Sequence, residues 1–223
     1  MGPFALTKWE ATLSNYPIFL EGLGTTLIAA VAGLVLALML GIIFGVLSTA
    51  SSKITRGLSR VYVEFFQNTP LLIQVFLLFN ALPLIAPKAV IPVVVVGILG
   101  VGFYHGAYIS EVVRAGIQSI HRGQLEAALS QGFTYVQAMR HIIIPQAMRV
   151  VLPPLTNQAV SLIKNTSVLA VIAGGDLMYR GDSYAGNMGN YGPTYIIVGL
   201  LYFLLCYPLA FAAKKLEDKQ EVS

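Results

Sequence analysis

The residues from Gly24 to Ala50 form one apolar run, GTTLIAAVAGLVLALMLGIIFGVLSTA, with no charged side chain. An α-helix rises about 1.5 Å per residue, so about 20 apolar residues cross the hydrocarbon core of a bilayer. This run is longer than that. A helix that is apolar on every side is stable in the core of a large protein or in a membrane. The run therefore predicts a membrane span and constrains the fold of everything that follows it.

Several further segments are nearly as apolar, and the composition agrees with them. Hydrophobic residues make up 56% of the 223 residues and charged residues only 11%, whereas about 25% of a soluble domain is charged. We therefore expect an all-α polytopic membrane protein with about five transmembrane helices. We expect a single domain, residues 1–223, with spans at 24–50, 58–82, 89–118, 150–173 and 194–213.

Lysine and arginine cluster between alternate spans, and this predicts how the chain is oriented. Ten of the fourteen basic residues follow the first, third or fifth span: Lys53, Arg56, Arg60, Arg114, Arg122, Arg140, Arg149, Lys214, Lys215 and Lys219. Loops rich in these residues stay in the cytoplasm. We expect the N-terminus outside and the C-terminus in the cytoplasm, and an odd number of spans gives the same arrangement.

The composition also excludes several classes of function. Cys206 is the only cysteine, which excludes an intrachain disulfide and a thiolate cluster, and the histidines His105, His121 and His141 lack metal-ligand spacing. The net charge of +4 lies in short clusters typical of topology signals rather than in a patch for nucleic acid. The sequence contains no nucleophile–base set. We expect no catalytic residues, no metal site and no nucleic-acid partner.

The segment 119–149, between the third and fourth spans, is polar and has the composition of two short helices. Gly132 falls between them, where a helix C-terminus needs positive φ. Residues 135–144 give the second helix, and Pro145 predicts a break before the next span. The apolar face of the first helix comprises Leu125, Ala128 and Leu129. We expect a helix–glycine–helix hairpin, and the spacing fits an ordinary interfacial helix equally well.

A polar stripe runs along the fourth span. At 100° per residue its members fall within an arc of about 120°: Asn157, Gln158, Ser161, Lys164 and Asn165. Polar groups in hydrocarbon are costly and face a bundle interior or a water-filled cavity. The stripe predicts either the lining of a translocation path or hydrogen bonds between helices.

Several single residues and short motifs predict local contacts or bends. Glu64, Gln67 and Asn68 share one face of the second span, where they join the predicted path, although Glu64 could instead pair with Arg60. Pro70 and Pro154 predict helix kinks. Glu111 and Arg114 are three residues apart and predict an ion pair at the end of the third span. Two GxxxG segments, beginning at Gly41 and Gly102, predict close helix packing. Residues 174–193 read as an external loop, either a docking surface for a binding protein or a plain connector.

The polar hairpin carries a spacing that resembles a known family. An EAA triplet is followed by a glycine and then by an isoleucine–proline motif: Glu126, Ala127, Ala128, Gly132 and Ile142 to Pro145. This is similar to the signature loop of permease subunits in bacterial ABC importers, with Ile144 in place of the usual leucine. Segments 68–79, 106–124 and 152–172 resemble the branch that takes up polar amino acids. The resemblance covers about residues 20 to 215.

The resemblance implies a type I importer permease in the bacterial inner membrane. The hairpin would be a coupling helix docked on a separate ATPase, through Arg122, Glu126, Ala127, Ala128 and Gly132. The chain lacks a G-x-x-x-x-G-K-[ST] phosphate loop, so ATP and Mg²⁺ would be bound by that partner and no cofactor by this chain. The implied assembly has two ATPase subunits, a second permease (identical or homologous) and an extracytoplasmic substrate-binding protein.

Three positions depart from the branch. Gln67 stands where arginine is usual, His121 where proline is common and Asn165 where aspartate is frequent. With amides in the stripe, a path selective for cations is disfavoured, and a substrate such as glutamine or glutamate is preferred. The alternative is a stand-alone secondary transporter or channel driven by an ion gradient. A membrane-embedded enzyme ranks below both.

Overall fold

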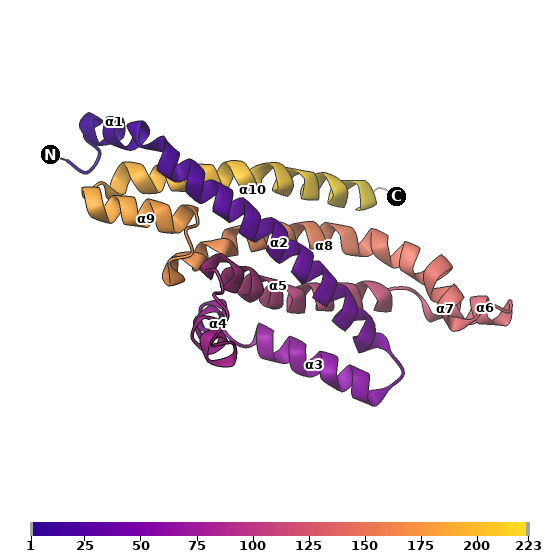
Figure 1. Ribbon diagram of the computed structural model, residues 1–223. Coiled ribbons are helices and arrows are strands. Elements are labelled where there is room, and N and C mark those ends of the chain that lie inside the picture. Colours follow the sequence, from indigo (N-terminus) through magenta and orange to yellow (C-terminus); the bar gives the residue numbers. More distant parts are fainter. Residues whose placement is uncertain (1, 222–223) are drawn as a thin grey trace.

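A computed structural model describes residues 2–221, and all regular elements in that range are helices (Figure 1). This confirms the all-α polytopic fold expected from the sequence. The elements, in chain order, are α1 (Leu6–Ser14), α2 (Tyr16–Thr49), α3 (Lys53–Gln67), α4 (Leu71–Ile85), α5 (Val93–Gln118), α6 (Arg122–Ser130), α7 (Tyr135–Ala138), a π-helical turn (Met139–Ile143), α8 (Ile144–Asn165), a 3-10 segment (Thr166–Ile172), α9 (Leu177–Met188) and α10 (Tyr191–Glu221).

The core of the bundle is the contact between α2 and α5, and glycine makes it possible. A Cβ built on Gly41 would lie 2.3 Å from Cγ2 of Ile109, and one built on Gly102 would lie 2.5 Å from Cδ2 of Leu36. No real side chain tolerates such distances, so glycine is required on both helices. Both GxxxG segments are confirmed as close-packing faces.

Within the described residues, three helices are long and apolar enough to span a membrane, namely α2, α5 and α10 up to Lys215. Up to five spans result if each bent helix pair counts as one. The second expected span, 58–82, is wrong as a single helix, because α3 and α4 meet at an angle of 103°. Pro70 stands at this break. Gln74, which is 3% exposed, donates from Nε2 to the backbone oxygens of Phe66 and Thr69, both at 2.9 Å, and so satisfies carbonyls that a continuous helix would have bonded.

The loop expected at 174–193 is also wrong, because most of it is the helix α9. The carboxylate of Asp176 accepts a hydrogen bond from the backbone N–H of Met178 at 3.0 Å and caps the start of the helix. Gly189, with φ of 60°, ends it. The helix packs against α2 and α10, and Leu177 and Tyr184 are buried there with Phe19. Of the glycines in this segment, Gly175 and Gly189 lie at the boundaries of the helix and Gly181 on its packed face, whereas Gly186 is exposed within the helix.

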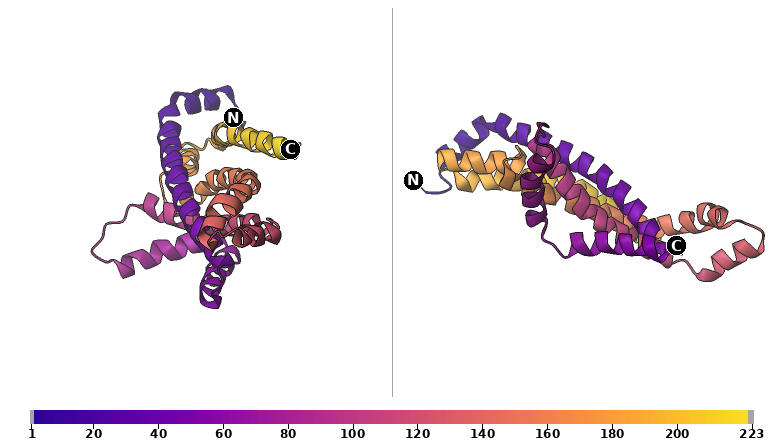
Figure 2. Two further views of the ribbon diagram at one scale, coloured as in Figure 1. Left: turned by 90° about the vertical axis from the view of Figure 1, so that its right-hand side faces the viewer. Right: turned by 60° about the horizontal axis from the view of Figure 1, so that its bottom comes forward.

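The two ends of the bundle differ. Figures 1 and 2 show α6 and α7 projecting from one end, which we call the hairpin end, while α1 and α9 lie at the other. There Asn190 fixes α1 to the bundle, since its Nδ2 donates to the backbone oxygen of Lys8 at 2.7 Å and to Oγ1 of Thr12. The N-terminal helix is therefore part of the packed structure.

Candidate functional site

The hairpin 119–149 has the predicted helix–glycine–helix form. At the end of α6 the backbone N–H of Gly132 donates to the oxygen of Leu129 at 3.0 Å, and that of Phe133 donates to Ala128 at 3.1 Å. These two bonds define a Schellman motif, which needs a left-handed residue. Gly132 supplies it with φ of +87°, which confirms the positive φ expected from the sequence.

The second arm of the hairpin begins with a capping box. Oγ1 of Thr134 accepts from the N–H of Gln137 at 3.3 Å, while Oε1 of Gln137 accepts from the N–H of Thr134 at 2.9 Å. The break expected at Pro145 is wrong, because the helix continues through it. Proline cannot donate to the preceding turn, and the π-helical turn Met139–Ile143 precedes it. The hairpin thus runs directly into α8.

The predicted coupling residues lie mostly on the outer surface of the hairpin. Arg122, Glu126, Ala127 and Gly132 are exposed, whereas Ala128 is 4% exposed and packs inside the hairpin. Nearby apolar side chains are also exposed, although a water-facing helix would normally hide them: Leu129, Phe133, Tyr135 and Val136. The hairpin therefore presents small and apolar groups, with a few charges, on its surface, and of these Arg122 and Tyr135 also line a hollow between the hairpin and the bundle.

Two members of the polar stripe of α8 contact His105 of α5. His105 is 2% exposed. Nδ2 of Asn165 lies 3.0 Å from Nε2 of the ring, and Oε1 of Gln158 lies 3.1 Å from Nδ1. An amide nitrogen only donates and an amide oxygen only accepts. The neutral ring with its proton on Nδ1 satisfies both contacts. Gln158 and Asn165 therefore join α8 to α5, which is the interhelical role left open by the sequence.

The rest of the stripe is more accessible. Asn157 and Lys164 are exposed and Ser161 is half-buried. Lys164 lines a shallow hollow of about 280 Å³ between α8, α9 and α10, with Met178, Tyr195 and Tyr202 among the other lining residues. Among the side chains described within residues 2–221, no carboxylate forms an ion pair with Lys164. An ammonium group without a carboxylate partner inside a membrane span needs water or a ligand.

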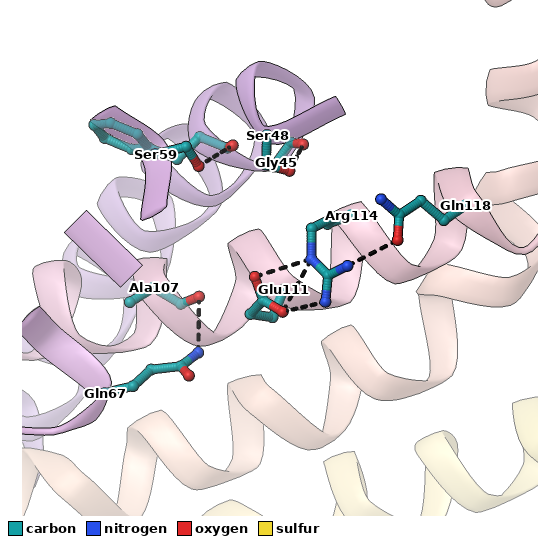
Figure 3. A network of polar contacts seen from close by, with 9 residues as sticks. Gly45, Ser48, Ser59, Gln67, Ala107, Glu111, Arg114 and Gln118 are labelled. Atoms are coloured by element: carbon teal, nitrogen blue, oxygen red, sulfur yellow. Dashed lines mark hydrogen bonds and ion pairs between the residues drawn. The ribbon is translucent and has the colours of Figure 1, made fainter. Parts of the chain in front are cut away.

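A second polar hollow, of about 490 Å³, lies between α3 and α5 near the hairpin end (Figure 3). Arg114 binds Glu111, with Nη2 and Oε2 at 2.5 Å, as expected from the sequence. Arg60 pairs with Glu64 at 2.6 Å, and this confirms the ion pair that the sequence suggested. Gln67 donates from Nε2 to the backbone oxygen of Ala107 at 3.3 Å. The charges in this hollow are largely paired.

The residues predicted to form one path do not meet in a single hollow. Glu64 and Gln67 line the hollow beside α5, and none of its lining residues comes from α8. Asn68 caps the C-terminal end of α3, where its Nδ2 donates to the backbone oxygen of Glu64 at 2.7 Å. Within one chain, therefore, the α3 residues and the α8 stripe occupy separate places.

A comparison with protein families decides what this helical bundle is. Residues 37–222 match the family described as the binding-protein-dependent transport system inner membrane component. The chain belongs to this family. It is therefore a multi-pass permease of the inner membrane, a transport subunit and not an enzyme, with the ATPase on a separate subunit.

Known relatives of the permease match it over nearly their whole length. It is 40% identical to the probable glutamine ABC transporter permease protein GlnM of Bacillus subtilis, over 94% of this chain and 96% of that protein. It is 31% identical to the glutamine transport system permease protein GlnP of Escherichia coli K12, over 96% and 98%. A solved structure of an amino acid ABC transporter with histidines covers 95% of this chain and 98% of its own, with a TM-score of 0.85 and 30% identity.

The feature of the permease that sequence reasoning missed is His105. The three histidines lack metal-ligand spacing, and this pattern assigns no role to His105. The available signal was its position on the face of α5 between Gly102 and Gly106, which packs against α2 and lies near α8. A polar residue on such a packed face needs partners from a neighbouring helix. Gln158 and Asn165, two turns apart, are those partners.

Proposed function

We propose that this permease is the membrane-spanning subunit of an ATP-driven importer for a polar amino acid, with a glutamine- or glutamate-like substrate preferred. The names of the glutamine relatives support this substrate class. The positions of the lysines and arginines support an N-terminus outside and a C-terminus in the cytoplasm. On this topology the hairpin end is cytoplasmic, and α1 and α9 lie at the external end.

The observation that carries the proposal is the hairpin itself. It projects from the bundle (Figure 1), and it exposes Leu129 and Val136 at 44% and 71% together with Glu126 and Ala127. Apolar groups on a projecting element indicate a protein partner. Permeases of this family work with a separate ATPase subunit, so we take the ATPase as that partner. Glu126, Ala127 and Gly132 form the contact, and Arg122, at the base of the hairpin, supports it. Ala128 holds the two arms of the hairpin together.

The remaining partners follow from the same proposal. Two ATPase subunits bind the cytoplasmic hairpins of two permeases, this chain and an identical or homologous second copy. A substrate-binding protein docks at the external end, where α1 and α9 lie. ATP and Mg²⁺ are bound by the ATPase subunits.

For the substrate path we propose the α8 stripe, with its members in two roles. Asn157, Ser161 and Lys164 face accessible space and would contact the substrate. Gln158 and Asn165 are held by His105 and would position the stripe. The unpaired ammonium group of Lys164 suits the carboxylate of an amino acid. Glu64, Gln67 and Asn68 would form the cytoplasmic exit of the path, beside α5.

Reconstitution of the complete transporter tests this function directly. We expect the permease to copurify with an ATPase subunit and to take up a polar amino acid into proteoliposomes only with ATP and the binding protein. Vanadate, which traps the hydrolytic cycle, should stop this uptake. Uptake by the permease alone, driven by an ion gradient and without ATP, would instead identify a secondary transporter.

Replacing Lys164 tests the substrate class. Lys164→Met keeps the length of the side chain and removes its charge, so uptake of the preferred amino acid should fall by about tenfold, the loss of one charge-assisted hydrogen bond. Lys164→Arg should retain most of the activity. Uptake across the twenty amino acids is measured in proteoliposomes, with Lys215→Met on exposed α10 as the matched control. Unchanged uptake by Lys164→Met would remove this residue from the path.

A further inference from the structure

A third hollow, of about 590 Å³, lies where the hairpin joins the bundle. Its walls come from the end of α2, the start of α3, the end of α5 and both arms of the hairpin. It adjoins the polar hollow of Figure 3, because Ser48, Arg56 and Gln118 line both. It lies apart from the α8 stripe, which contributes no lining residue.

The charge in this hollow has one sign. Arg56 and Arg122 line it together with His121, and no carboxylate is among its lining residues. The adjoining hollow differs, since it contains Glu64 and Glu111, which already bind Arg60 and Arg114. Two guanidinium groups around an aqueous cavity without a carboxylate attract an anion.

The donors in the hollow are available to such an anion. Within the part of the chain that the structure describes, Arg56 donates only from Nη1, to the backbone oxygens of Ala50 and Ser51, each at 2.7 Å. Arg122 is exposed, and none of the carboxylate side chains that the structure describes lies within ion-pair distance of it. Nδ1 of His121 accepts from the N–H of Gly123 at 3.1 Å, so a neutral ring carries its proton on Nε2 and can donate from there.

Part of the remaining lining is apolar, beside the polar side chains of Ser48, Thr49 and Gln118, and this apolar part narrows the chemical class of the anion. Aliphatic side chains form that part of the wall: Ile117, Ile120, Leu125, Met139 and Ile143. On the proposed topology the hollow lies at the cytoplasmic boundary of the bilayer, because the apolar run of α2 ends at its rim. A ligand with a charged phosphate and an attached hydrocarbon part fits these surroundings, and basic pockets at this boundary typically bind lipid headgroups.

We propose that this hollow binds the headgroup phosphate of an anionic phospholipid from the cytoplasmic leaflet. A zwitterionic headgroup fits less well, because its ammonium group would find no carboxylate among the lining residues. The phosphate would bridge Arg56 on α3 and Arg122 on α6, and so fasten the base of the hairpin to the membrane-embedded helices. The proposal rests on the topology given above but not on the identity of the transported substrate.

Native mass spectrometry of the complete transporter, released from nanodiscs of phosphatidylcholine with a minor fraction of phosphatidylglycerol, tests this. We expect the wild type to retain phosphatidylglycerol above its bulk fraction, and Arg56→Gln with Arg122→Gln to reduce that enrichment by about tenfold. The control variant, Lys53→Gln with Arg140→Gln, also removes one positive charge from α3 and one from the hairpin, but both residues lie outside the hollow. This control should retain the enrichment of phosphatidylglycerol. Equal enrichment in the wild type and the Arg56/Arg122 variant would overturn the site.

Two further measurements distinguish a bound lipid from poor assembly of the variant and from binding of a free anion. Arg56→Gln alone leaves the hairpin untouched, so it reports on the hollow even if the double variant assembles poorly, and it should lower the enrichment by about threefold. Inorganic phosphate added to transporter in pure phosphatidylcholine should not raise its melting temperature. Stabilisation by phosphate equal to that by phosphatidylglycerol would show that a free anion binds here and would overturn the assignment to lipid.

Discussion

Gly132→Val is expected to abolish ATP-driven uptake while the permease still inserts into the membrane. Gly132 has φ of +87°, a region that costs an L-residue about 1–2 kcal/mol and a β-branched residue more. A Cβ at this position would meet no atom within 4 Å. The damage is therefore confined to the turn, where the Schellman bonds to Leu129 and Ala128 would be lost, and the two arms would no longer form one surface.

Three measurements separate loss of coupling from loss of folding. Membrane fractionation reports insertion, copurification reports binding of the ATPase, and substrate-stimulated ATP hydrolysis reports coupling. Gly132→Asn is the matched variant, because asparagine adopts left-handed backbone more readily than valine, and it should keep a substantial part of the activity. Normal uptake with normal stimulated hydrolysis in Gly132→Val would refute the assigned role of the turn.

His105→Leu should lower the stability of the permease by about 2 kcal/mol, because it leaves the amides of Gln158 and Asn165 without their shared partner. Both contacts join α5 to α8 at 3.0–3.1 Å in a packed interior. Uptake should fall as well, since the α8 stripe loses its support. Thermal unfolding in detergent and uptake in proteoliposomes give the two readouts.

Compensating substitutions make the His105 prediction specific. Replacing all three partners, with Gln158→Leu and Asn165→Leu added to His105→Leu, removes the unpaired polar groups and should restore much of the stability without restoring uptake. His141→Leu, an exposed histidine on the π-helical turn, is the control and should change the melting temperature little. A His105→Leu protein as stable as the wild type would contradict the hydrogen-bonded bridge.

The sequence predicted the features that depend on local pattern. Long apolar runs gave α2, α5 and α10, and the glycine at 132 gave the turn of the hairpin, because φ > 0 has a distinct residue preference. The GxxxG segments and the Glu111–Arg114 pair also follow from helical spacing alone.

Features set by contacts between distant segments were not predictable in this way. The 103° bend between α3 and α4 depends on Gln74, whose buried amide binds carbonyls at the break. Helix α9 depends on packing against α2 and α10, and its glycines resembled those of a loop. His105 could be understood only when Gln158 and Asn165, far along the chain, were seen beside it.

The continuity of the hairpin with α8 has a mechanical consequence. The chain is helical from Tyr135 to Ile172 without a sharp bend, so this segment would act as a lever with one end at the hairpin. At about 1.5 Å per residue, Lys164 lies about 44 Å from Tyr135, and a tilt of about 10° about the hairpin would displace it by about 8 Å. If the hairpin docks on the ATPase as proposed, a small rotation there would be converted into a displacement comparable to the length of an amino acid.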